Sequence, residues 1–162
     1  NLINELKIDQ IENLEVKNID VLNEPVVEKY NFELENAYDQ VGNSIYLSPL
    51  LFIRMGENPF KLKERQFPIN FTHPFTLTRI INLKFPEEYQ IESLPEPVNF
   101  ALPEEMGSFV YKIAQNKNSL NLIIEFNINK PVIPVAYHSA LQDLYNSRVV
   151  KENEKVVLTK IQ

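Results

Sequence analysis

The chain has no cysteine among its 162 residues. This absence excludes disulfides, thiolate metal ligands and a cysteine nucleophile, and it leaves the redox compartment open. Glycine is also scarce, with only Gly42, Gly56 and Gly107, so no glycine-rich loop can be assembled around a phosphate. We therefore expect neither nucleotide binding of that kind nor any other cofactor.

Long apolar runs and clustered basic residues are missing as well. The longest apolar stretch lies around residues 50–53 and is far too short to span a bilayer. The formal charge is −6, the pI is near 5.0, and lysine and arginine are scattered along the chain. The sequence therefore predicts no membrane span and no nucleic-acid partner. Residues 1–10 have neither the basic start nor the apolar core of a signal peptide.

What the chain does contain is a strong strand pattern, punctuated by eleven prolines. In residues 119–129 apolar and polar side chains alternate, which is typical of an antiparallel strand with one wet face. In residues 66–72 the alternation turns Phe67, Ile69 and Phe71 inward. Asn116-Lys117-Asn118 is typical of a tight hairpin, because asparagine tolerates left-handed backbone. Strands are expected over 26–35, 44–48, 66–72, 75–85, 89–93, 98–102, 108–115, 119–129 and 155–161.

One helix is expected near the C-terminus. Leu141, Leu144 and Arg148 follow the three- and four-residue spacing of a helix face, which predicts a helix over about 136–152. Ser139 and Gln142 have the spacing of a capping box at its start.

Together these elements predict a mainly β fold. We expect an antiparallel β-sandwich of about eight or nine strands, with the C-terminal helix followed by a last strand. Residues 25–162 would form this sandwich domain. Residues 1–24 would be a linker or a leading strand from a preceding domain, with 11–19 as the candidate strand.

Few residues are candidates for chemistry. His73 and His138 have no histidine or cysteine partner at ligand spacing, so no metal site is expected. A cryptic hydrolase that uses His138 with Asp143 is the weakest of the hypotheses considered. The carboxylate pairs Glu87-Glu88 and Glu104-Glu105 each follow a proline, and solvated turns explain them better than an acid–base pair. We therefore assign no catalytic, cofactor-binding or metal-binding residue.

The tyrosines offer an alternative in which the chain is an independent module that binds a glycan or a protein. If several of them were exposed together, they would form a platform for a sugar ring or a protein partner. The loops around Glu57 and Glu96 would complete that surface. The tyrosines in question are Tyr38, Tyr46, Tyr89, Tyr137 and Tyr145.

Two further features have structural explanations. Arg65, ahead of a predicted strand, is expected to pair with backbone carbonyls or a carboxylate. Asn70-Phe71-Thr72 matches the N-glycosylation sequon but lies in a predicted strand.

Several short motifs along the chain form a recognisable set. The first is Asn58-Pro59-Phe60 with Arg65 and Pro68-Ile69-Asn70-Phe71 after it. The others are Pro25 to Tyr30, Ile45-Tyr46-Leu47-Ser48-Pro49, Phe85-Pro86-Glu87-Glu88-Tyr89, Ser93-Leu94-Pro95, Tyr137 to Val150 and Val156-Val157-Leu158-Thr159-Lys160. Together these motifs resemble the C-terminal β domain, itself of unknown function, of bacterial exported transglutaminase-like proteins. The resemblance covers most of the chain from about residue 25 onward.

This resemblance implies that the chemistry lies outside the chain. In that family a Cys-His-Asp triad in the preceding domain attacks an amide carbonyl, and no position here can supply the cysteine. The chain would be a non-catalytic accessory domain, not an enzyme, packed on a transglutaminase-like cysteine protease or transferase domain of the same protein. The protein would be exported, to the periplasm or the cell surface of a Gram-negative bacterium.

Overall fold

The computed structural model describes residues 11–34 and 37–161. Their contacts divide the chain into two compact units, Asn1–Ala37 and Tyr38–Gln162. The expected domain boundary at residue 25 stays a prediction.

The described part of the first unit is a β-hairpin. Strand β1 (Ile11–Lys17) pairs antiparallel with β2 (Val27–Phe32), and the register shifts between Glu12 and Glu15. Leu14, Val16 and Val27 remain exposed within this pair. None of the residues described in these two strands is fully buried. The predicted strand over 26–35 corresponds to β2, which ends earlier, at Phe32, and residue 35 lies outside the described residues.

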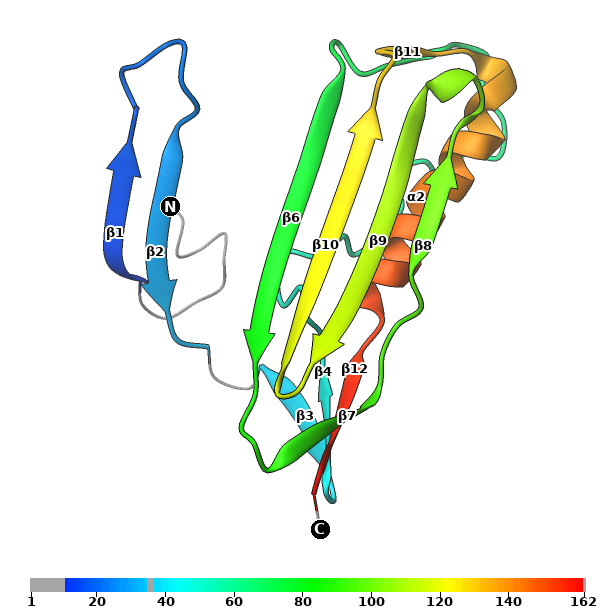
Figure 1. The fold of residues 1–162 in the computed structure, drawn as a ribbon. Coiled ribbons are helices and arrows are strands. Elements are labelled where there is room, and N and C mark those ends of the chain that lie inside the picture. The colour runs from blue at the N-terminus through cyan, green and yellow to red at the C-terminus, as the bar shows by residue number, and fades with distance from the viewer. Residues whose placement is uncertain (1–10, 35–36, 162) are drawn as a thin grey trace. The chain divides into compact units, whose positions relative to one another are not determined.

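The second unit contains two four-stranded antiparallel sheets (Figure 1). The first has the order β6-β10-β9-β8 and comprises Phe75–Lys84, Ser119–Ile128, Gly107–Asn116 and Val98–Ala101. The second has the order β3-β4-β12-β7 and comprises Tyr38–Val41, Ser44–Leu47, Val156–Lys160 and Tyr89–Ser93. A short pair joins β5 (Ile69–Asn70) to β11 (Val132–Ile133). The predicted mainly β, antiparallel fold is confirmed.

One α-helix, α2 (His138–Asn153), lies between β11 and the last strand, as predicted. It packs against β9 and β8, and Figure 1 shows it covering that half of the first sheet. Two short 3₁₀ turns, η1 (Pro103–Glu105) and η2 (Val135–Tyr137), precede β9 and the helix. The layer over that half of the first sheet is therefore the helix.

The hydrophobic core follows the alternation of the first sheet. In β10 every second residue is buried, and Phe126 pairs directly with Phe109 of β9 and Leu77 of β6. Leu141 and Leu144 of the helix and Val156 of β12 join the same core. Gly107 is needed at the start of β9, because a Cβ there would lie 2.6 Å from the carbonyl oxygen of Asn127.

Three local predictions need correction. The strand expected over 66–72 is only β5, and Phe67 is 73% exposed instead of inward, because Pro68 follows it and the pairing with β11 begins at Ile69. The helix begins at His138 with Tyr137 as its N-cap, so Ser139 and Gln142 form no capping box. The hairpin at Asn116-Lys117-Asn118 is present, but the residue with positive φ is Lys117 and not an asparagine.

Candidate functional site

The most strongly coordinated polar group in the second unit is the carboxylate of Glu152, in the last turn of α2. Its side chain is fully buried. Oε2 accepts from the backbone N of Met55 at 2.6 Å, and Oε1 accepts from Nε of Arg148 at 2.6 Å. A guanidinium nitrogen of Arg79 lies 3.2 Å from both oxygens. Three donors from three parts of the chain therefore converge on one buried acid.

The two arginines are themselves held by the fold. The guanidinium carbon of Arg148 lies 4.6 Å from the centre of the Phe126 ring, a cation–π contact in the core. Arg79 lies in β6 opposite Ile124 and is partly buried. Burial lowers the pKa of Arg79, and the charge of Glu152 opposes this shift. Since a buried charge is costly unless it is paired, each of these three groups depends on the others.

A stripe of polar residues on α2 fastens the segment of residues 55–62, which we call the strap. Gln142 donates from Nε2 to the carbonyl oxygens of Phe60 and Leu62, at 2.8 and 2.9 Å. Asn58 donates from Nδ2 to Oδ1 of Asn146, at 2.7 Å, and Asn153 donates from Nδ2 to the carbonyl oxygen of Met55, at 2.8 Å. The Asn58-Pro59-Phe60 motif is thus the part of the strap that meets the helix.

An aromatic side chain of the strap fills the space beneath these bonds. The Phe60 ring packs edge-on against Tyr145 of the helix, with centroids 4.9 Å apart, and also contacts Phe71. Tyr145 in turn packs against Phe126 in the core. The strap is therefore joined to the core by packing as well as by hydrogen bonds.

His138 belongs to the same stripe. Its Nε2 lies 2.8 Å from the carbonyl oxygen of Leu62. A carbonyl can only accept, so Nε2 carries the proton in this bond. Nδ1 is buried without a hydrogen-bond partner among the described residues. Asp143 is exposed and follows five residues later, about 140° away around the helix. The structure therefore does not bring His138 and Asp143 together, and His73 is exposed in the turn before β6.

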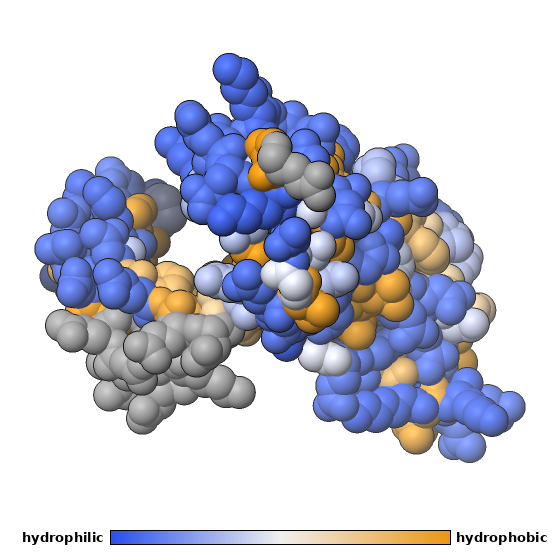
Figure 2. Space-filling model, turned by 90° about the horizontal axis from the view of Figure 1, so that it is seen from below, coloured by the Kyte–Doolittle hydropathy of each residue, from blue (hydrophilic) through white to orange (hydrophobic). Residues whose placement is uncertain are grey.

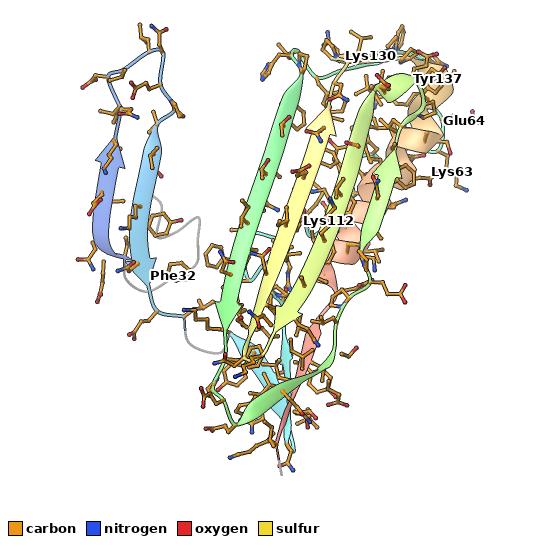
Figure 3. The ribbon with its side chains drawn as sticks, viewed as in Figure 1. Phe32, Lys63, Glu64, Lys112, Lys130 and Tyr137 are labelled. Atoms are coloured by element: carbon orange, nitrogen blue, oxygen red, sulfur yellow. The ribbon has the colours of Figure 1, made fainter. Side chains whose placement is uncertain are left out.

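The carboxylate pairs lie in exposed turns, as the sequence indicated. In η1, Glu104 accepts from the hydroxyl of Tyr137 at 2.6 Å and pairs with Nζ of Lys130 at 3.3 Å. Figure 3 shows Lys130 and Tyr137 at the end of the sheet where the helix begins. The hydrogen bond from Tyr137, followed by Lys130, lowers the pKa of Glu104, and the same bond raises the pKa of Tyr137. Glu105 is exposed, and this arrangement does not make it an acid–base partner of Glu104.

The other pair borders a pocket. Glu87 and Glu88 are exposed between β6 and β7. Glu87 lines a cavity of about 290 Å³ whose other walls are Tyr89, Gln90, Lys117, Asn118 and Ile161. The backbone N of Phe85 donates to the carbonyl oxygen of Asn118, at 3.0 Å, which joins one lining residue to the end of β6. Glu87 and Lys117, the acid and the lysine of this cavity, are both exposed at its rim.

The tyrosines do not gather into a platform. Tyr145 is buried in the core, and burial raises its pKa. Tyr38 pairs with Leu47, whereas Tyr46 pairs with Asp39, so the two tyrosines lie on opposite faces of their sheet. Tyr89 and Tyr137 are half-buried at separate places. On the face seen in Figure 2, apolar residues form small separate groups among hydrophilic ones.

The remaining candidates are minor. Half-buried Arg65 makes no hydrogen bond or ion pair within the described residues, so the expected pairing is not found there. The Oδ1 of Asn70 accepts from the backbone N of Thr72 at 2.8 Å, which makes the sequon a local turn. Glu57 pairs with Lys61 on the surface, and Glu96 is exposed.

Sequence reasoning missed the Arg79–Glu152–Arg148 cluster, although a signal was present. Arg79 interrupts the inward row of β6 between Leu77 and Ile81. Arg148 lies on the inward stripe of the helix, and Glu152 follows four residues later. A charge at an inward position needs a partner, and the sequence holds two cations and one anion at such positions.

The part of the chain that the structure describes lacks two kinds of feature. It holds no group of three or more histidine, cysteine, aspartate or glutamate side chains placed to bind a metal ion. No helix there is long and apolar enough to cross a membrane.

Comparisons with known proteins place the second unit in a family. The family model described as a domain of unknown function with a solved structure, DUF3858, matches residues 43–158. No curated protein matches the chain. A crystal structure from Parabacteroides distasonis, described as a "putative protease", is similar with a TM-score of 0.52 and 12% sequence identity. The similarity covers 60% of this chain but only 19% of that one, and at this identity it shows the fold alone. The chain belongs to the DUF3858 family.

Proposed function

We propose that the chain is a non-catalytic accessory domain of a longer protein. This proposal rests on one observation, which is that the buried polar groups of the second unit bind other parts of the same fold. Glu152 binds Arg148, Arg79 and the backbone of the strap, and His138 binds the strap carbonyl of Leu62. These groups stabilise a loop on a helix, whereas a general base needs a free lone pair that faces a substrate.

Two observations support the proposal that the chain is part of a larger protein. The similar region of the P. distasonis structure is 19% of its chain, so there the fold is one part of a longer protein described as a "putative protease". The motifs that resemble transglutaminase-like proteins include Asn58-Pro59-Phe60, which forms the centre of the strap. We therefore propose that the partner is a transglutaminase-like catalytic domain of the same protein. We also propose that this protein is exported.

Deletion from the parent protein tests the accessory role. The parent protein would be compared with a variant that lacks residues 38–162, by thermal unfolding of the catalytic domain and by turnover of an amide substrate. We expect the catalytic domain to keep its nucleophile but to unfold at a lower temperature or to bind substrate more weakly. Unchanged unfolding, KM and kcat would show that this unit does not assist the catalytic domain.

The glycan-binding alternative receives no support from the tyrosines. A sugar platform needs several exposed aromatic rings on one face. Tyr145 is instead in the core, and Tyr38 and Tyr46 lie on opposite faces of one sheet. We therefore keep the accessory role as the single proposal.

A further inference from the structure

Residues 63–67 form an exposed connection between the strap and β5. Lys63, Glu64, Gln66 and Phe67 are exposed, and Arg65 is half-buried. Figure 3 shows Lys63 and Glu64 on the outer side of the helix. None of these five residues makes a hydrogen bond or an ion pair to another residue that the structure describes. A protease must draw several residues of its substrate into an extended conformation, so a stretch without such bonds is open to cleavage.

Both ends of this connection are held firmly. On one side, the carbonyl oxygen of Leu62 accepts from Nε2 of Gln142 at 2.9 Å and lies 2.8 Å from Nε2 of His138. On the other side, buried Ile69 pairs with Ile133 of β11. The part of the chain that is free of bonds is therefore confined to the few residues between these two anchors.

We propose that the peptide bond between Arg65 and Gln66 is a processing site for a protease that cleaves after arginine. We also propose that the second unit stays assembled as two fragments after the cut. Hydrolysis adds one water across this bond and leaves a carboxylate on Arg65 and an ammonium group on Gln66. Because Arg65 has no hydrogen-bond or ion-pair partner among the described residues, its side chain gives up only packing when it enters the protease.

The chain has four arginines, and two of them lie in regular structure. Arg79 is in β6 and Arg148 is in α2, and both bind the buried carboxylate of Glu152. A protease reaches the peptide bonds beside them only when the strand or the helix unfolds. The comparison that matters is therefore between Arg54 and Arg65.

Backbone bonding distinguishes these two arginines. Arg54 is exposed, whereas Arg65 is half-buried, so exposure alone would select Arg54. The residue after Arg54 is held on both sides, however. The backbone N of Met55 donates to Oε2 of Glu152 at 2.6 Å, and its carbonyl oxygen accepts from Nδ2 of Asn153 at 2.8 Å. Cleavage after Arg54 requires these bonds to break first, and cleavage after Arg65 does not.

The fragment before the cut is built into the second unit. It supplies β4, which lies between β3 and β12 in the second sheet. β4 pairs with β12 along its whole length, from Ser44 to Leu47. Leu50 is only 1% exposed in the core, and the Phe60 ring packs 4.9 Å from that of Tyr145. These contacts do not depend on the Arg65–Gln66 bond, so they keep the two fragments together.

Digestion of the native chain with an arginine-specific protease tests the proposal without reference to the accessory role. Mass spectrometry identifies the cuts, and size-exclusion chromatography shows whether the fragments separate. Cleavage after Arg65 is expected to be more than about tenfold faster than cleavage after Arg54, because only the second needs local opening. Fragments 1–65 and 66–162 are expected to elute together, at the position of the uncut chain.

Two conservative variants give the matched control. Arg65→Lys is expected to resist this protease with an unchanged unfolding temperature, and Arg54→Lys is expected to be cut as fast as wild type. Three results would each overturn the proposal. They are cleavage after Arg54 at least as fast as after Arg65, a native chain that resists a protease dose which cuts it in urea, and fragments that separate on the column.

Discussion

Glu152 shows how one buried acid can determine the position of a loop. Its carboxylate satisfies two arginines and the backbone of Met55, and its side chain is fully buried. Burying these charges is costly, so the cluster adds specificity to the packing more surely than it adds net stability. Its value lies in fixing the strap, the helix and β6 in one arrangement.

Replacing Glu152 by glutamine leaves two partly or fully buried arginines without their counter-charge. We expect the free energy of unfolding to fall by about 3–5 kcal/mol, the usual cost of breaking a buried ion pair. Glu57→Gln is the control, because its pair with Lys61 is exposed and should be worth about 0–1 kcal/mol. Urea unfolding of both variants measures the difference. Equal losses would mean that the buried cluster is no more important than a surface pair.

The Glu104–Tyr137 bond makes a prediction about titration. The bond lowers the pKa of Glu104, so its contribution to stability is present above the ordinary glutamate pKa and is lost as the pH falls through the lowered value. Tyr137→Phe should therefore raise the pKa of Glu104 toward its ordinary value, although Lys130 remains in place. Carboxyl NMR titration of wild type and variant measures this directly. An unchanged pKa would show that the hydroxyl makes no such bond in solution.

Gly107 tests the packing between β9 and β10. A Cβ at this position would lie 2.6 Å from the backbone oxygen of Asn127 and 3.2 Å from Leu102. Because backbone must move to relieve that contact, Gly107→Ala should lower the free energy of unfolding by about 1–3 kcal/mol. Gly56→Ala has open space around it and should be nearly neutral. Thermal or urea unfolding compares the two variants. If they were equally stable, the backbones of β9 and β10 could move apart at Gly107 without a loss of free energy.

Among the elements, the strap is held by side chains and not by regular structure. Gln142 is central, because it binds two strap carbonyls, Phe60 and Leu62. Gln142→Ala should loosen the strap and speed trypsin cleavage after Lys61 and Lys63, which are exposed on either side of Leu62. Gln90→Ala on β7 is the control, and mass spectrometry identifies the cleavage sites. If cleavage after these lysines were as slow as in wild type, the strap would not depend on this side chain.

Regular elements were accessible from the sequence for a physical reason. In β10 and α2 the spacing of apolar residues matches the period of the strand or helix. Those residues are therefore buried together in the core, which stabilises the element. The strap gives no such signal, because its bonds to the helix join residues 76 to 98 positions apart, as from Leu62 to His138 and from Met55 to Asn153. The sequence wrongly predicted an inward Phe67 for a related reason. Its alternation with Ile69 suggested a strand, but Pro68 and the short partner β11 limit the pairing to two residues.

The candidate site was accessible only in part. The sequence correctly favoured exposed turns for the carboxylate pairs, since each follows a proline. It could not show that His138 meets Leu62, or that Arg79 and Glu152 meet, because both contacts depend on how helix and sheet pack. The inward positions of Arg79 on β6 and of Arg148 and Glu152 on α2 were the available hints.

At the scale of the whole molecule, the second unit should fold without the first. Tyr38–Gln162 contains the whole described core, whereas the described part of the first unit is a two-stranded hairpin with exposed apolar residues. Removing residues 1–37 should therefore leave the unfolding temperature of the remainder nearly unchanged. Calorimetry of the full and shortened chains measures this, and a large loss of cooperativity or stability would show that the hairpin is part of the same folding unit.

If the buried polar groups of the second unit stabilise an accessory domain and do not carry chemistry, stability and turnover should respond differently to their loss. The most direct measurement is to compare kcat and the stability of this unit in the parent protein with and without Glu152→Gln. We expect a less stable unit and an unchanged kcat, at a temperature where the unit remains folded. A kcat that fell while stability stayed at the wild-type value would show that Glu152 takes part in the chemistry.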